Sequence, residues 1–113
     1  MLNPTHYQKW NKILGEYIDI QMEDNKYISP INGTKIVNLK FHESWEWLMI
    51  VVNKILEEVS LRFNFSTISV ELYAENNSML KSFSEPTLLL NTYSVCLQYM
   101  KYLKEYEASK TII

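Results

Sequence analysis

Glycine, arginine and cysteine are scarce in this sequence. Its 113 residues include two glycines and one cysteine. With two glycines the chain has no glycine-rich phosphate loop, which argues against the common nucleotide-dependent enzymes. Its single arginine, Arg62, equips it poorly for bidentate recognition of phosphate or guanine. The formal charge is −2 and the lysines are scattered along the chain, so composition also argues against nucleic-acid binding.

A lone cysteine, Cys96, excludes a disulfide within the chain and a Cys-x-x-Cys motif. A reduced compartment fits this best, and we expect a cytoplasmic protein. The first ten residues lack the basic region and apolar run of a signal peptide. The longest uninterrupted apolar run, Leu48 to Val52, is far shorter than the ~20 residues that span a bilayer, so no membrane partner is expected.

Three stretches carry the signals of a helix. Each begins with a residue whose side chain can cap the first turn, and two place a proline close to that start. The first continues with apolar residues at helical spacing as far as Gly15, which we expect to end it. The expected starts are Asn3-Pro4, Ser44 and Ser84-Glu85-Pro86.

Strand signals occupy the segments between these helices. Asn32-Gly33 predicts a tight hairpin turn with both residues at positive φ, and Pro30 places its strand at a sheet edge or a bulge. Residues 66–77 alternate, with Val70 and Leu72 among the residues that face inward. A short partner strand is expected over residues 79–83.

The order is therefore helix, hairpin, helix, strand pair, helix. Strands joined by tight turns pair antiparallel. We expect an α+β fold, a small antiparallel sheet with about three helices packed mainly on one face. Apolar residues make up 47% of the chain, which suits a single α+β domain over residues 1–113, with residues 107–113 as a loose tail.

The segment FHESWEWLMIVVNKI, Phe41 to Ile55, places two tryptophans at the start of an apolar helix. Trp45 leads a stripe that continues through Leu48, Val52 and Ile55 at spacings of three and four. Trp47 lies about 200° around the helix from Trp45, so the two rings cannot share a direction. We expect Trp45 in the core and Trp47 at its edge or on the surface.

The same segment holds the best candidates for catalytic chemistry, and each has a simpler interpretation. His42-Glu43 would need a second histidine three residues after the glutamate to match a zinc protease, but Glu46 occupies that position. Glu43 and Glu46 could form an acid/base pair, but two glutamates at a helix start also suit the helix dipole. Replacing His42 or Glu46 with alanine should leave folding nearly unchanged. Cys96 lies among apolar residues in the last helix, where a small core residue is expected.

No serine stands in a Gly-x-Ser-x-Gly elbow. We therefore expect no catalytic residues, no metal ligands and no cofactor.

Two segments of the chain resemble recurrent segments of a group of small uncharacterised proteins of Bacteroidetes bacteria and their phages and prophages. That group has a helix start of the form Trp-x-Trp-Leu-Met followed by Val-Val-x-Lys-Ile, and a C-terminal helix with an aromatic-x-Lys-aromatic end. Ile50 stands where the group often has proline. The resemblance implies a cellular setting and no chemistry. The matching residues are Trp45, Trp47, Leu48, Met49, Val51, Val52, Lys54 and Ile55, then Thr92, Tyr93, Tyr99, Lys101 and Tyr102.

Aromatic residues are the remaining candidates for function. Most of them suit a core, but tyrosine and tryptophan also anchor protein interfaces. Trp47, Tyr73 and Tyr106 are the better candidates for exposed anchors. We therefore expect a non-enzymatic protein–protein interaction module of phage or mobile-element type, acting on a host or viral protein.

Two alternatives stay open beside the interaction module. One is a small-molecule-binding or metal-independent enzyme domain whose pocket is assembled from tertiary neighbours. The other is a nucleic-acid-binding α+β domain. The sequence also leaves a homo-oligomer open.

Overall fold

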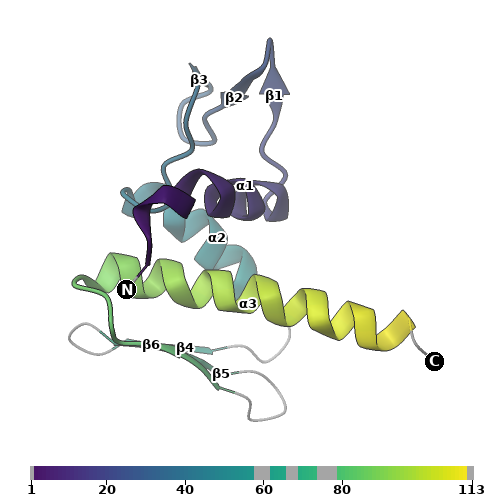
Figure 1. Cartoon of the computed structure of the whole chain (residues 1–113). Helices are drawn as coiled ribbons and strands as arrows, with labels where there is room; N and C mark the ends of the chain where they lie inside the picture. Colours follow the sequence, from purple (N-terminus) through teal and green to yellow (C-terminus); the bar gives the residue numbers. More distant parts are fainter. Residues whose placement is uncertain (1, 58–61, 66–68, 74–78, 112–113) are drawn as a thin grey trace.

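Three α-helices and two small antiparallel sheets form the α+β fold seen in the computed structural model, which confirms the expected fold class (Figure 1). The structure describes residues 2–57, 62–65, 69–73 and 79–111. A 3-10 turn, η1 (Pro4–His6), leads into α1 (Tyr7–Tyr17), and the other helices are α2 (Trp45–Glu57) and α3 (Leu88–Thr111).

The strands form two separate sheets rather than the single sheet expected. One sheet has the order β1-β2-β3, and the other has the order β4-β5-β6. Figure 1 shows the first sheet extending beyond α1 and the second lying along the opposite side of α3. The strands are β1 (Met22–Glu23), β2 (Lys26–Ile28), β3 (Lys35–Ile36), β4 (Arg62–Phe65), β5 (Val70–Tyr73) and β6 (Met79–Ser82).

The first two helix starts have the predicted caps, whereas the third helix begins at Leu88, after the predicted Ser84-Glu85-Pro86. Asn3 Oδ1 accepts a hydrogen bond from the Thr5 N–H at 3.1 Å at the start of η1. Ser44 Oγ accepts one from the Trp47 N–H at 3.5 Å at the start of α2. At the third helix the capping oxygen belongs to Thr87, which accepts from the Leu90 N–H at 3.1 Å. These bonds satisfy N–H groups that have no partner inside a helix.

Two helices extend further than the sequence indicates. Gly15 does not end α1, which continues to Tyr17. A Cβ atom at Gly15 would lie 3.1 Å from Leu39 Cδ1, so this glycine permits close packing rather than ending the helix. At the other end of the chain α3 continues to Thr111, so residues 107–111 of the expected tail are helical.

The tight turn of the first sheet lies one hairpin earlier than predicted. Asp24 and Asn25 link β1 to β2 and both have positive φ, 53° and 61°. Asn32-Gly33 instead belongs to a wider loop, and only Gly33 has positive φ. Asn32 acts through its side chain, since its Oδ1 accepts from the Thr34 N–H at 3.1 Å, and this bond replaces the predicted two-residue turn.

Pro30 lies within that loop and in no strand.

The prediction that Trp45 is buried and Trp47 lies at the edge of the core is wrong, because the two are exchanged. Trp47 is 5% exposed and Trp45 is 40% exposed. The Trp47 ring packs edge-on against buried Phe41, with ring centroids 5.2 Å apart. Val51 is fully buried and moves the centre of the buried stripe toward Trp47, so Trp45 falls on the flank of α2.

The core joins all three helices to the second sheet. Val70 and Leu72 of β5 face inward and are buried, as their alternation predicts. Cys96 of α3 is fully buried, which confirms its expected place in the core. The buried apolar residues are Leu14, Leu39, Phe41, Trp47, Leu48, Val51, Val52, Ile55, Val70, Leu72, Tyr93, Val95, Cys96 and Tyr99.

Candidate functional site

A buried asparagine in α1 ties three parts of the fold together. Asn11 Nδ2 donates to the Leu39 carbonyl oxygen at 2.9 Å and approaches His42 Nδ1 at 3.0 Å. Asn11 Oδ1 accepts from the Tyr93 hydroxyl at 2.9 Å. Because the Asn11 amide donates to both partners, His42 Nδ1 must accept and Nε2 must carry the proton. This network fixes α1 against α3 and against the segment that precedes α2.

Burial sets the protonation of the network. It lowers the pKa of His42, and the Glu43 carboxylate, 3.9 Å from Nε2, opposes this shift in part. Burial raises the pKa of Tyr93 and, with help from Glu85, that of Tyr7. The His42 ring also stacks on Tyr7 with ring centroids 4.3 Å apart. Near pH 7 these groups are therefore neutral, and His42 joins the packing of the helices.

These contacts revise the expectation that His42→Ala would leave folding nearly unchanged.

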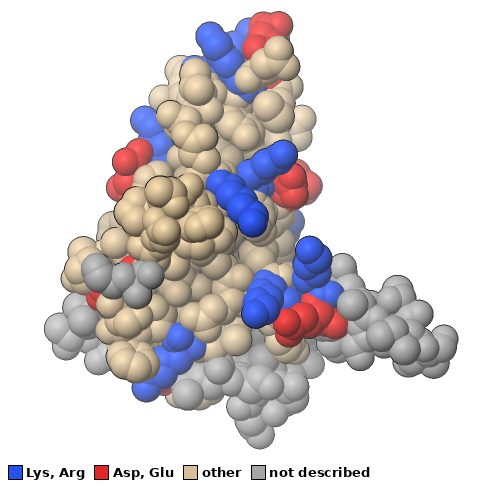
Figure 2. Space-filling model, viewed as in Figure 1, with Lys and Arg blue, Asp and Glu red and all other residues tan. Residues whose placement is uncertain are grey.

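An apolar groove runs between α1 and α3. Its volume is about 680 Å³, and α1 contributes Trp10 and Ile13 while α3 contributes Leu97 and Met100. Ile13 is 39% exposed, a high fraction for an isoleucine in a helix that packs on the core. Figure 2 shows a broad uncharged surface over this part of the molecule, with lysine side chains beside it.

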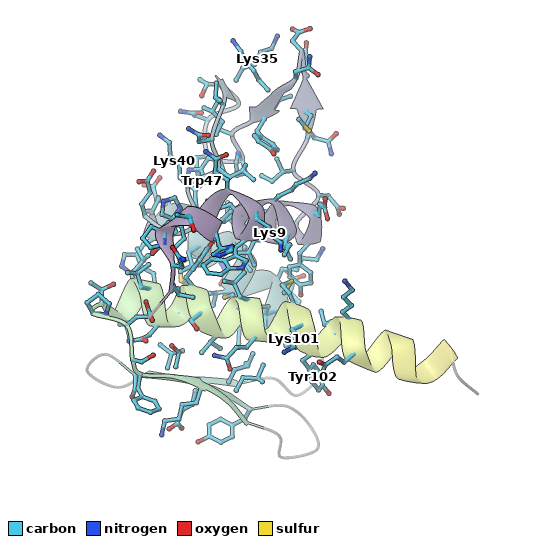
Figure 3. All side chains as sticks on the ribbon, viewed as in Figure 1. Lys9, Lys35, Lys40, Trp47, Lys101 and Tyr102 are labelled. Atoms are coloured by element: carbon cyan, nitrogen blue, oxygen red, sulfur yellow. The ribbon has the colours of Figure 1, made fainter. Side chains whose placement is uncertain are left out.

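Lysines lie in and beside the groove although the whole chain carries −2. Lys101 and Lys104 line the groove together with Glu16. Lys9 and Lys12 line a second hollow, of about 280 Å³, on the other side of α1. Figure 3 shows Lys9 on α1 and Lys101 on α3. The groove is therefore lined by two lysines and one glutamate around an apolar centre, and α1 carries two further lysines outside it.

A polar hollow of about 390 Å³ lies between the β2–β3 loop and the start of α2. Lys40, Glu43 and Glu46 line it, and Trp47 also contributes. In Figure 3, Lys40 lies close to Trp47 at this corner. All three charged side chains are exposed, so neither carboxylate has the desolvated environment that a general acid requires.

The three predicted anchors do not form one surface. Trp47 is buried, so the prediction that it is an exposed anchor is wrong. Tyr73 is half-buried in β5, where its hydroxyl donates to the Glu71 carboxylate. Tyr106 lies in α3, but its side chain falls outside the described residues. Trp47 and Tyr73 belong to different parts of the fold, on opposite sides of α3 (Figure 1).

Sequence reasoning missed the groove. Its α1 signal is Ile13, an apolar residue beside the predicted stripe and next to a lysine. Its α3 signal is the width of the apolar surface, which covers two adjoining faces of the helix. A single neighbouring element would cover only one of these faces. The position of α1 on α3 decides which of these faces stays uncovered. Local sequence patterns do not predict that position.

The described residues, 2–57, 62–65, 69–73 and 79–111, contain no group of three or more histidine, cysteine, aspartate or glutamate residues placed to hold a metal ion. None of their helices combines the length and the apolar character needed to cross a bilayer. Burial raises the pKa of the Cys96 thiol, which suits a residue of the core rather than a nucleophile.

Comparisons with known proteins give no match for this chain, whether with family models, curated proteins or solved structures.

Proposed function

We propose that this chain is a non-enzymatic protein–protein interaction module that binds its partner through the groove between α1 and α3. The observation that carries the proposal is the apolar centre of that groove. Trp10, Ile13, Leu97 and Met100 line it and Ile13 stays 39% exposed. Apolar hollows of this kind accept the side chains of a partner protein, and aromatic residues and methionine are enriched in such surfaces.

The arrangement behind the groove supports a rigid binding surface. Asn11 and Tyr93 lie behind it and hold α1 to α3 through a buried hydrogen bond of 2.9 Å. The two helices that form the walls are thereby fixed before a partner arrives. A preformed site loses less conformational entropy on binding than a flexible one.

The proposed cellular setting rests on the resemblance of the α2 and α3 segments to proteins of Bacteroidetes and their phages. In that setting the partner is a host or viral protein, met in the cytoplasm.

The polar hollow beside Trp47 supports a second candidate function, the binding of a small polar molecule. Lys40, Glu43 and Glu46 line it, so it offers both signs of charge within one hollow of about 390 Å³. It is open and its charged groups are exposed, which suits weak binding more than catalysis.

Affinity purification from the native host tests the interaction. Tagged wild-type chain, Ile13→Glu and Ile31→Glu would be expressed in parallel, and the recovered proteins identified by mass spectrometry. Ile31 is the matched control because it is 43% exposed and lies in the β2–β3 loop, away from the groove. We expect a protein that the wild type and Ile31→Glu retain and Ile13→Glu loses.

Identical recovery with all three chains would contradict the proposed groove. Circular dichroism of the purified variants, compared with the wild type, verifies that each is folded.

A further inference from the structure

The charges around the α1/α3 groove indicate what kind of partner it fits. Lys9 and Lys12 each precede a groove residue of α1 by one position, so they lie about 100° around the helix, on its outer ridge. On α3, Lys101 and Lys104 follow Leu97 and Met100 by four positions, so they continue the groove face by one turn. Lysines therefore lie in the groove on α3 and just outside it on α1.

These lysines are available to a partner. Within the described part of the chain, none of the four forms an ion pair; the ion pairs present there involve Lys35, Lys81 and His42. All four side chains are exposed. Among the described residues Glu16 is the one acidic residue that lines the groove, and exposed Glu105 follows Lys104 on α3. A partner that carries negative charge on its flanks would gain attraction without breaking any of these ion pairs.

The shape of the site favours a helix as the bound element. The hollow is concave, about 680 Å³, and is lined along two helices that pack against each other. An amphipathic helix places apolar side chains at i, i+3, i+4 and i+7, and such a stripe fills an apolar groove. Residues beside the stripe then face the walls of the groove, where the lysines lie.

We infer that the groove takes a partner helix whose apolar stripe is flanked by aspartate and glutamate residues. This inference rests on the proposed function of the groove and adds the chemistry of the partner. A second copy of the chain docked through the same face would bring lysines against lysines, which opposes a two-fold dimer there. A membrane surface would require protruding apolar side chains, whereas the apolar centre here is hollow.

A library of displayed helical peptides tests the inference. Each peptide would have about 18 residues, with apolar residues fixed at i, i+3, i+4 and i+7 and all other positions random. The full chain is the bait, and binding of the selected peptides is measured by fluorescence anisotropy. We expect selected peptides to be rich in aspartate and glutamate, and to bind the Lys101→Glu/Lys104→Glu variant at least about tenfold more weakly.

The double variant Lys26→Glu/Lys35→Glu is the matched control, because these lysines are also exposed but lie in β2 and β3, away from the groove. It should bind the selected peptides as the wild type does. Ile13→Glu reports on the groove itself and should abolish binding. The exposed lysine variants keep the test decisive if Ile13→Glu does not fold.

Three results would overturn the inference. Selected peptides that need Ile13 but carry no acidic excess would refute the acidic partner and leave the proposed groove standing. Peptides that all bind Ile13→Glu as well as wild type would refute both. Co-sedimentation of the chain with vesicles of phosphatidylcholine and phosphatidylserine, lost in Ile13→Glu, would assign the face to a membrane instead.

Discussion

Replacing each tryptophan of α2 with alanine measures how the helix faces the core. Trp47 is 5% exposed and contacts Phe41 edge-on, whereas Trp45 is 40% exposed. Truncation of a buried tryptophan costs ~3–5 kcal/mol of unfolding free energy, and we expect Trp47→Ala to fall in that range.

The expected difference between the two variants follows from their burial. The exposed fractions differ by about 35% of the residue surface. For a tryptophan that can bury ~250 Å², this is ~90 Å², worth ~2 kcal/mol at ~25 cal/mol per Å². Trp45→Ala should therefore cost ~1–3 kcal/mol, about 2 kcal/mol less than Trp47→Ala.

Urea denaturation followed by circular dichroism provides the assay, because it does not depend on tryptophan fluorescence. The free energy of unfolding of each variant is compared with that of the wild type at equal denaturant slopes. Equal losses, or a larger loss for Trp45→Ala, would refute the orientation of α2 and with it the burial of Trp47.

Three other predictions concern single positions. Gly33 has φ +73° and a Cβ there would meet nothing within 4 Å, so Gly33→Val should cost ~1–2 kcal/mol in denaturant melts through backbone strain alone, and Gly33→Asn clearly less. Equal melts of the two variants would contradict this. Because burial lowers the pKa of His42, its contribution to stability is complete above about pH 6.5 and declines as the pH falls below that value. The stability advantage of the wild type over His42→Gln should therefore shrink between about pH 7 and about pH 5, and a constant advantage would count against the buried neutral ring. Cys96 is fully buried and burial raises its thiol pKa, so a thiol reagent should modify it only in concentrated denaturant; rapid modification of the native protein would place it at the surface.

Local sequence patterns predicted where helices and strands lie better than they predicted which face of each element is buried. The alternation of β5 placed Val70 and Leu72 in the core, because a strand has only two faces and one is apolar. On α2 the spacing of apolar residues predicted a buried stripe. It did not determine which residues form the centre of that stripe. Phe41 and Val51 decide that centre, and Phe41 acts through a contact outside the helix.

The hairpins show how two similar signals can compete. Asn32-Gly33 is the stronger dipeptide for a two-residue turn, yet Asp24-Asn25 forms that turn. Asn32 uses its side-chain oxygen to cap the Thr34 N–H, and Ser29 pairs with Thr34 across a wider loop. The strand β4 was not predicted, since its four residues stand next to no strong turn signal.

The candidate site could not be predicted from local sequence. Trp10 and Met100 each belong to an apolar pattern at helical spacing, and such a pattern by itself predicts a place in the core. Whether such faces meet or leave a groove depends on the packing of α1 against α3, which the buried bond between Asn11 and Tyr93 fixes. The grouping of these lysines is also a tertiary property, since the lysines of α1 and those of α3 are more than 80 positions apart in sequence.

The central claim is that the α1/α3 groove contacts a partner protein, and photo-crosslinking in living cells tests it most directly. A benzoylphenylalanine residue would replace Ile13 in one chain and Ile31 in another, since these two side chains have similar exposure, 39% and 43%. A partner bound in the groove should give a covalent adduct of defined mass from position 13 and none from position 31. The absence of an adduct at position 13, or equal adducts at both positions, would contradict the claim.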